Sequence, residues 1–114
     1  MDNLIRRKCF EFALEMVKLY CELRNAREYV LSKQLLRSGT SIGANVEEAT
    51  AGQSRGDFLS KMAIASKEAR ETRYWLLLIK ESRIVEVDVR DELAHVDELI
   101  RILTSIVKTM SEKR

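Results

Sequence analysis

Proline is absent from this chain of 114 residues, and glycine occurs at four positions. Without proline, long helices form free of the kinks and missing hydrogen bonds that this residue causes. Long apolar runs are missing too, because the longest, residues 74–79, falls far short of the roughly 20 residues that a membrane helix needs. The chain also has no large excess of one charge. Its 20 basic and 18 acidic residues are too balanced to indicate nucleic-acid or membrane binding by themselves.

Cysteine and histidine are scarce, which limits the chemistry that the chain can perform. On one helix, Cys9 and Cys21 would be about 18 Å apart, beyond the roughly 7 Å limit for a disulfide. With no apolar signal segment at the start, we expect a reducing, cytoplasmic location. Glu92 and His95 match the Glu-x-x-His step of di-iron bundles, but that site requires a second histidine. We therefore expect no metal site, cofactor or catalytic set, and a surface His95 paired with Asp91 or Glu98.

Apolar residues recur at alternating steps of three and four, which predicts helices. The first helix is expected over residues 3–24. Capping residues predict the next three starts: Asn25 with Glu28, Ser54 with Asp57, and Asp88 with Asp91. Gly52 would end the second helix. The expected core stripes are Cys9, Phe12, Met16, Leu19 and Leu23; Leu31, Leu35, Ile42, Val46 and Ala49; Phe58, Met62, Ala65, Ala69, Thr72, Leu76 and Ile79; and Val89, Leu93, Val96, Ile100, Leu103, Val107 and Met110. The pattern predicts a single all-α domain over residues 1–114, an antiparallel up-down-up-down four-helix bundle.

The last predicted helix has more apolar surface than one core requires. Leu99, Ile102 and Ile106 lie to one side of its stripe and widen the apolar arc to about half the circumference. An exposed apolar strip is typical of a subunit interface, so we expect these three residues to contact another copy of the chain. The alternative is that a neighbouring helix of the same bundle covers them.

Small residues concentrate in the second predicted helix, where Gly39 and Gly43 stand four residues apart. They allow a neighbouring helix backbone to approach closely. A phosphate-binding loop is excluded, because the Gly-Lys-Ser/Thr ending is missing.

A polar stripe borders the core of the same helix: Gln34, Arg37, Ser38, Ser41, Asn45 and Glu48. It is either a hydrogen-bonded seam between helices or subunits, or a ligand or nucleic-acid contact. Glu47 and Glu48 lie near the carboxyl end of the helix, where the dipole disfavours negative charge, so we expect Lys61, Arg55 or a partner to balance them.

A basic patch with one aromatic residue is predicted on the third helix, formed by Lys67, Arg70, Arg73 and Tyr74. Such a patch suits phosphate and base contacts. Glu68 and Glu71 interrupt the patch, however, and favour the other interpretation, a solvated face on which Lys67 pairs with Glu71.

Two segments carry a family resemblance: residues 34–49, QLLRSGTSIGANVEEA, and residues 57–76, DFLSKMAIASKEARETRYWL. They resemble the bacterial four-helix-bundle proteins named for intervening sequences in the 23S ribosomal RNA gene. The resemblance implies a homopentamer with a central channel and no catalytic activity. It also implies kinship with the accessory protein of diversity-generating retroelements, which binds nucleic acid and a reverse transcriptase through basic surfaces.

We therefore expect a non-enzymatic, cytoplasmic homo-oligomer that binds RNA or an RNA-associated protein through basic patches. The alternative is a protein–protein scaffold without nucleic-acid binding. An enzyme is a third possibility, and it would require a pocket around Ser41, Asn45 and Glu48.

Overall fold

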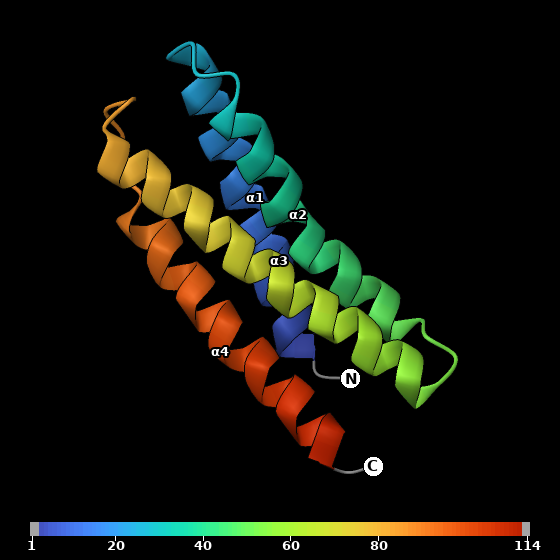
Figure 1. Ribbon diagram of the computed structural model, residues 1–114. Coiled ribbons are helices and arrows are strands. Elements are labelled where there is room, and N and C mark those ends of the chain that lie inside the picture. Colours follow the sequence, from blue (N-terminus) through green and yellow to red (C-terminus); the bar gives the residue numbers. More distant parts are fainter. Residues whose placement is uncertain (1–2, 113–114) are drawn as a thin grey trace.

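The computed structural model describes residues 3–112, which form four helices and, within that range, no strand (Figure 1). The helices are α1 (Asn3–Asn25), α2 (Leu31–Thr50), α3 (Arg55–Ser82) and α4 (Arg90–Glu112). They lie side by side in a body of 47 × 21 × 21 Å. The predicted all-α four-helix bundle is confirmed. No helix of the described range is long and apolar enough to cross a membrane.

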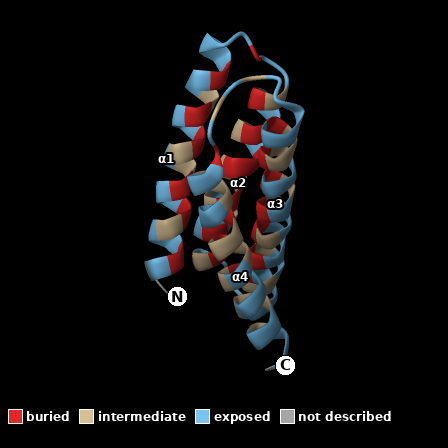
Figure 2. Ribbon diagram, turned by 90° about the vertical axis from the view of Figure 1, so that its left-hand side faces the viewer, coloured by how far each residue is buried: buried red, intermediate tan, exposed pale blue. Residues whose placement is uncertain are grey.

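Successive connections lie at alternate ends of the bundle (Figure 1). The α1–α2 and α3–α4 connections share one end, and the α2–α3 connection lies at the other end, near both termini. Helices α1 and α3 each pack against both α2 and α4. The four inner faces therefore enclose one core, and the buried residues, red in Figure 2, lie along the inward sides of the helices.

The core confirms the predicted stripes of the first three helices, except that Leu31 and Phe58 are half-buried. The predicted stripe of the last helix is confirmed in part, at Val89, Val96 and Leu103. The buried residues of α4 are Val96, Leu99 and Leu103, and the predicted Leu93 and Ile100 are half-buried. Leu99 is 2% exposed within a single chain, so its predicted place in a subunit interface is wrong. The alternative, burial within the same bundle, holds for this residue.

The two helix-interior glycines let α2 approach α1 closely. A Cβ at Gly39 would overlap the Met16 side chain. A Cβ at Gly43 would lie 3.3 Å from the Cβ of Cys9, which is a tight contact. The predicted packing role is confirmed, and Gly39 has the stricter requirement.

The start of α2 differs from the prediction, because Asn25 belongs to α1 and α2 begins at Leu31. Glu28 is the capping residue. Its carboxylate accepts hydrogen bonds from the backbone N–H groups of Val30, Leu31 and Ser32 at 3.1, 3.1 and 2.7 Å. The other two predicted caps act as expected: Ser54 Oγ accepts from the N–H of Asp57, and Asp88 Oδ1 accepts from the N–H of Arg90.

Candidate functional site

Helices α3 and α4 together carry the predicted basic patch. Arg70 Nη2 donates to Thr104 Oγ1 at 3.0 Å, and Arg73 Nε donates to Asp97 Oδ1 at 2.8 Å. A shallow cavity of about 270 Å³ lies beside these contacts, lined by Arg70, Arg73, Asp97 and Ile100. The two arginines therefore lean across to α4 while remaining exposed.

Two cations of α4 extend this surface. Arg101 and Lys108 are exposed. Thr104 lies three residues after Arg101 and four residues before Lys108, so all three share one face of α4. The Arg70–Thr104 hydrogen bond places that face beside α3. We define the α3–α4 basic face as Lys67, Arg70, Arg73, Arg101 and Lys108. The i, i+3, i+7 spacing of Arg101, Thr104 and Lys108 is visible in the sequence. It does not show, however, which other helix this face of α4 lies beside.

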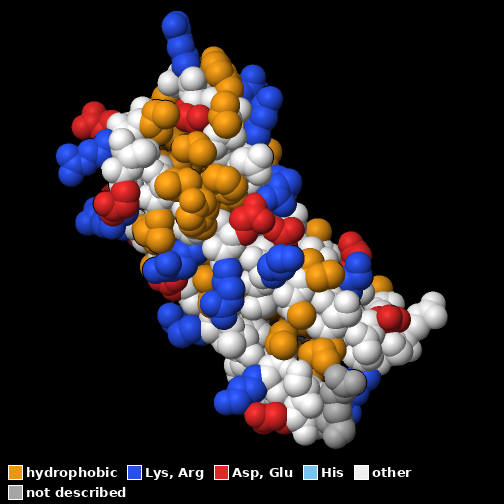
Figure 3. Space-filling model, viewed as in Figure 1, with side chains coloured by type: hydrophobic (Ala, Val, Ile, Leu, Met, Phe, Trp, Pro, Cys, Tyr) orange, Lys and Arg blue, Asp and Glu red, His pale blue; other side chains and the backbone are white. Residues whose placement is uncertain are grey.

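Lys67 and Tyr74 point outward from α3, and Tyr74 is 58% exposed. The predicted pairing of Lys67 with Glu71 is wrong. Glu71 binds Arg37 of α2 and accepts a hydrogen bond from Trp75 Nε1 instead. Lys67 therefore keeps its charge available at the surface. Figure 3 shows Lys and Arg side chains gathered across the middle of this side of the molecule, next to a hydrophobic cluster.

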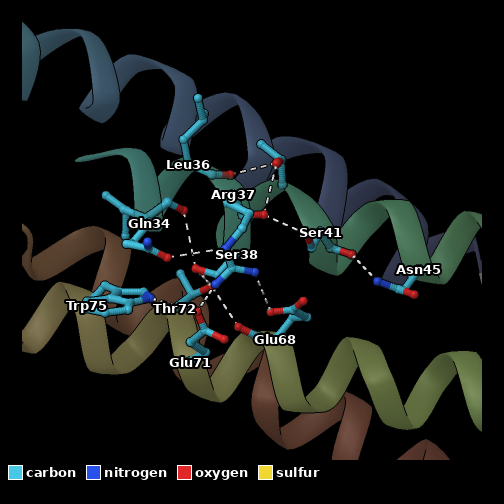
Figure 4. A network of polar contacts seen from close by, with 12 residues as sticks. Gln34, Leu36, Arg37, Ser38, Ser41, Asn45, Glu68, Glu71, Thr72 and Trp75 are labelled. Atoms are coloured by element: carbon cyan, nitrogen blue, oxygen red, sulfur yellow. Dashed lines mark hydrogen bonds and ion pairs between the residues drawn. The ribbon is translucent and has the colours of Figure 1, made fainter. Parts of the chain in front are cut away.

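The polar stripe of α2 faces α3, and half of it contacts that helix (Figure 4). Ser38 and Thr72 are both buried, with their hydroxyl oxygens 2.9 Å apart. Arg37 binds Glu71 and, at 3.5 Å, Glu68. Gln34 Oε1 accepts from Arg37 Nε at 3.4 Å, which holds the guanidinium in place.

The remaining stripe residues have simpler partners. Ser41 Oγ donates to the carbonyl of Arg37, and Asn45 Nδ2 donates to the carbonyl of Ser41, so both are satisfied within their own helix. Glu48 binds Lys61 of α3 at 2.8 Å, as expected. Among the residues described, every buried side-chain nitrogen and oxygen has a hydrogen-bond partner. The stripe thus has the bonding of a seam.

Polar side-chain pairs also join α1 and α4. His95 Nδ1 lies 2.7 Å from Glu15 Oε2, so the expected pairing with Asp91 or Glu98 is wrong. Glu98 binds Lys8 instead, at 3.1 Å. A cavity of about 220 Å³ lies between these pairs. In the described part of the chain, no three His, Cys, Asp or Glu side chains are placed to hold a metal ion.

Helix α1 has an apolar stripe on its outer side, which the sequence interpretation missed. Phe10, Leu14 and Val17 are 66%, 48% and 45% exposed, and the exposed Cys21 continues the stripe. Their spacing of four, three and four residues places them on one helix face, opposite the buried stripe. Cys9 lies on that buried side, where burial and then the charge of Glu47 raise the pKa of its thiol to about 12. Ile102 and Ile106 of α4 are half-buried against the core.

The family model of the 23S rRNA-intervening sequence protein matches residues 1–105. The chain belongs to this family. Its described helices resemble a crystal structure of a protein of unknown function from the S23 ribosomal protein family of Bacteroides thetaiotaomicron, with 48% sequence identity and a TM-score of 0.84. The likeness covers 91% of this chain and 98% of that chain. A search of curated proteins found no match.

Both segments that carry the family resemblance contribute to the core. Residues 34–49 form most of α2, with the glycines against α1 and Ser38 against α3. Residues 57–76 form most of α3, including Thr72 and the arginines of the α3–α4 basic face. Lys108, by contrast, lies beyond the matched range. The two segments therefore cover the α1–α2–α3 packing and the three cations that α3 gives to the basic face.

Proposed function

We propose that this member of the 23S rRNA-intervening sequence protein family is a non-enzymatic, cytoplasmic homo-oligomer that binds RNA through the α3–α4 basic face. An RNA-associated protein is the related possibility for the same face. The proposal includes no cofactor and no small-molecule substrate.

The Arg70–Thr104 hydrogen bond is the observation that carries this proposal. It places Arg70 beside Thr104, whose face of α4 also carries the exposed Arg101 and Lys108 by helix spacing. With Lys67 and Arg73 of α3, this surface has five cations. Arg73 is the member that is balanced locally, by Asp97. Clustered Lys and Arg side chains displace counterions from a phosphate backbone, and this displacement supplies most of the affinity of sequence-independent RNA binding. Tyr74, exposed on α3, adds a ring on which a base can stack.

Self-association is supported by the outer stripe of α1. In a single chain, Phe10, Leu14 and Val17 are exposed to solvent, although the opposite face of α1 is already buried in the core. We propose an antiparallel up-down-up-down bundle as the subunit, with this stripe at one contact between copies and Ile102 and Ile106 of α4 at another. In a ring of five copies, the arrangement that the resemblance implies, the α3–α4 basic face would be repeated five times. Such repetition converts weak phosphate contacts into avidity.

Fluorescence anisotropy with a labelled single-stranded RNA tests the proposed function. We expect wild-type binding that weakens steeply with added salt, and its loss in the double variant Arg70→Glu/Arg73→Glu. Asp97→Asn should strengthen binding by about 3-fold, because it releases Arg73 from its ion pair. Lys61→Glu is the matched control, since Lys61 binds Glu48 at the α2–α3 seam and lies outside the basic face. Equal losses in Lys61→Glu and in the double variant would contradict the proposal.

A protein–protein scaffold is the alternative function, and the outer stripe of α1 favours it. In that case the outer stripe of α1 would bind another protein instead of a second copy of this chain. Absence of RNA binding at every salt concentration, in a protein that still assembles, would support the scaffold over the RNA-binding function.

A further inference from the structure

The α1–α2 and α3–α4 connections lie at the same end of the bundle (Figure 1) and share an unusual backbone feature. Arg27 has φ 66° and Arg83 has φ 55°, and among the described residues these are the two non-glycine residues with positive φ. Each follows a helix and occupies the left-handed position at which glycine is usual. The Arg27 N–H donates to the carbonyl of Arg24, and the Glu28 N–H to that of Leu23, which completes the helix-ending motif.

Folding alone does not require arginine at these two positions. A left-handed conformation disfavours any side chain with a Cβ, and glycine adopts it freely. Both connections nevertheless carry a long cation there. Since the helix-ending hydrogen bonds at Arg27 are made by backbone atoms, its side chain remains available for a partner.

The acidic residue of the α1–α2 connection does not oppose these cations at the surface. Glu28 is 8% exposed, and its carboxylate is turned inward onto three backbone N–H groups. Arg27 and Lys33 remain exposed on either side of it. Arg24 lies over the ring of Tyr20, with 5.7 Å between its guanidinium carbon and the ring centroid. The outward surface of this connection is therefore positively charged.

Exposed apolar groups stand between those charges. Tyr29 is 50% exposed, and Val30, next to it, is 71% exposed. On the α3–α4 connection, Ile84 is 60% exposed beside Arg83. A groove of about 480 Å³ adjoins it, lined by Lys80, Arg83, Val85, Glu86 and Val87. An aromatic ring flanked by cations suits a phosphate backbone with an accessible base.

We infer that this end of the bundle binds single-stranded RNA, with Arg27 and Lys33 on phosphates and an unpaired base stacked on Tyr29. The inference rests on the proposed function and adds a second contact region, distinct from the α3–α4 basic face. It also specifies the substrate class, since a base within a duplex is stacked on its neighbours and offers no free face to Tyr29. The basic face, in contrast, contacts the backbone of either form.

Anisotropy with a 12-nucleotide oligouridine and with an RNA duplex of the same length tests this inference. Tyr29→Ala should weaken oligouridine binding about 10-fold and leave duplex binding unchanged. Tyr29→Phe keeps the ring and should bind oligouridine like the wild type. Arg27→Gly should weaken oligouridine binding and leave duplex binding unchanged, while keeping or raising the melting temperature, because glycine relieves the left-handed backbone. Arg27→Lys keeps the charge and should retain most of the affinity.

The outcomes separate this inference from the proposed function. If the wild type binds neither RNA, both are wrong. If binding is lost in Arg70→Glu/Arg73→Glu but is unchanged in Tyr29→Ala and Arg27→Gly, the basic face stands and this inference is overturned. Equal loss of oligouridine and duplex affinity in Tyr29→Ala would also overturn it, because stacking requires an unpaired base.

Discussion

Ser38 of α2 and Thr72 of α3 meet in the core with their hydroxyl oxygens 2.9 Å apart, each with less than 1% of its surface exposed. Thr72 Oγ1 also lies 2.8 Å from the carbonyl oxygen of Glu68, whereas the nearest other partner of Ser38, the carbonyl of Leu35, is 3.5 Å away. The pair is therefore a buried polar link between α2 and α3, at the level where the glycines allow α2 to lie close to α1.

Removing one hydroxyl of this pair should lower the free energy of unfolding by more than half of what removing both would. We expect Thr72→Val to destabilise the fold by about 1–2 kcal/mol, because it leaves Ser38 buried with a poor partner, and Ser38→Ala by about 1 kcal/mol. The double variant should be less destabilised than the sum of the two. Urea unfolding of the four proteins measures this coupling, and strict additivity would show that the hydroxyls do not interact.

Gly39 and Gly43 should respond differently to alanine. Alanine gains about 1 kcal/mol of helix propensity at either position. At Gly39 the new methyl overlaps Met16, so we expect a net destabilisation of about 1–3 kcal/mol. At Gly43 the 3.3 Å approach to Cys9 is tight but tolerable, so the propensity gain should roughly offset it. Thermal melts compare the two variants, and equal melting temperatures would contradict this reading of the α1–α2 contact.

Stability should fall in acid through Glu28. Burial raises the pKa of its carboxyl, but the N–H hydrogen bonds from Ser32, Leu31 and Val30 outweigh burial and leave the pKa below its usual value. The contribution of the ionised group is therefore complete above its unfolded pKa of about 4.3 and disappears as the pH falls through the lower folded value. Glu28→Gln should cost about 1 kcal/mol at pH 7, and less in acid. Urea unfolding of the wild type and Glu28→Gln, at pH 7 and again below the unfolded pKa, measures this difference.

Glu92 provides a control of opposite sign. Burial, and then the charges of Glu15, Asp91 and Glu22, raise the pKa of its carboxyl. Ionised Glu92 therefore opposes folding at neutral pH, and this cost is removed as the pH falls through the raised value. Glu92→Gln should raise the melting temperature at pH 7. A drop comparable to that of Glu28→Gln would contradict the assignment.

The outer stripe of α1 should control assembly. We expect light scattering of the wild type to give a multiple of the 13.2 kDa chain mass. Leu14→Glu, at a position that is 48% exposed, should give the single-chain mass with unchanged helical content. A wild type of 13.2 kDa would contradict self-association, and an intact assembly in Leu14→Glu would place the interface elsewhere.

The sequence predicted the α2 and α3 faces well, because steps of three and four residues place their buried residues on one side of each helix. It was less accurate on α4, where Val96 and Leu103 are buried as predicted but Leu99 and Ile100 are adjacent in a wide apolar arc, and periodicity does not indicate which of them points inward. On α1 the inner stripe was predicted, but the second apolar stripe, formed by Phe10, Leu14 and Val17, was missed.

Side-chain pairs between different helices could not be predicted from the sequence, for a different reason. The expected partners of His95 and Lys67 lay within one helix turn, yet His95 pairs with Glu15, and Glu71 pairs with Arg37. Spacing along one helix gives local neighbours, whereas these contacts depend on how two helices are placed beside each other. For the same reason, Arg101 and Lys108 joined the basic face only after the Arg70–Thr104 contact was known.

The salt dependence of RNA affinity tests most directly whether α3 and α4 form one binding surface. For a single strand, each lost phosphate contact reduces the slope of log affinity against log salt by about 0.7. The double variant Arg101→Gln/Lys108→Gln should therefore have a slope about 1.4 shallower than the wild type. An unchanged slope, with Arg70→Glu/Arg73→Glu still defective, would show that α4 takes no part and that the α3–α4 basic face is not a single surface.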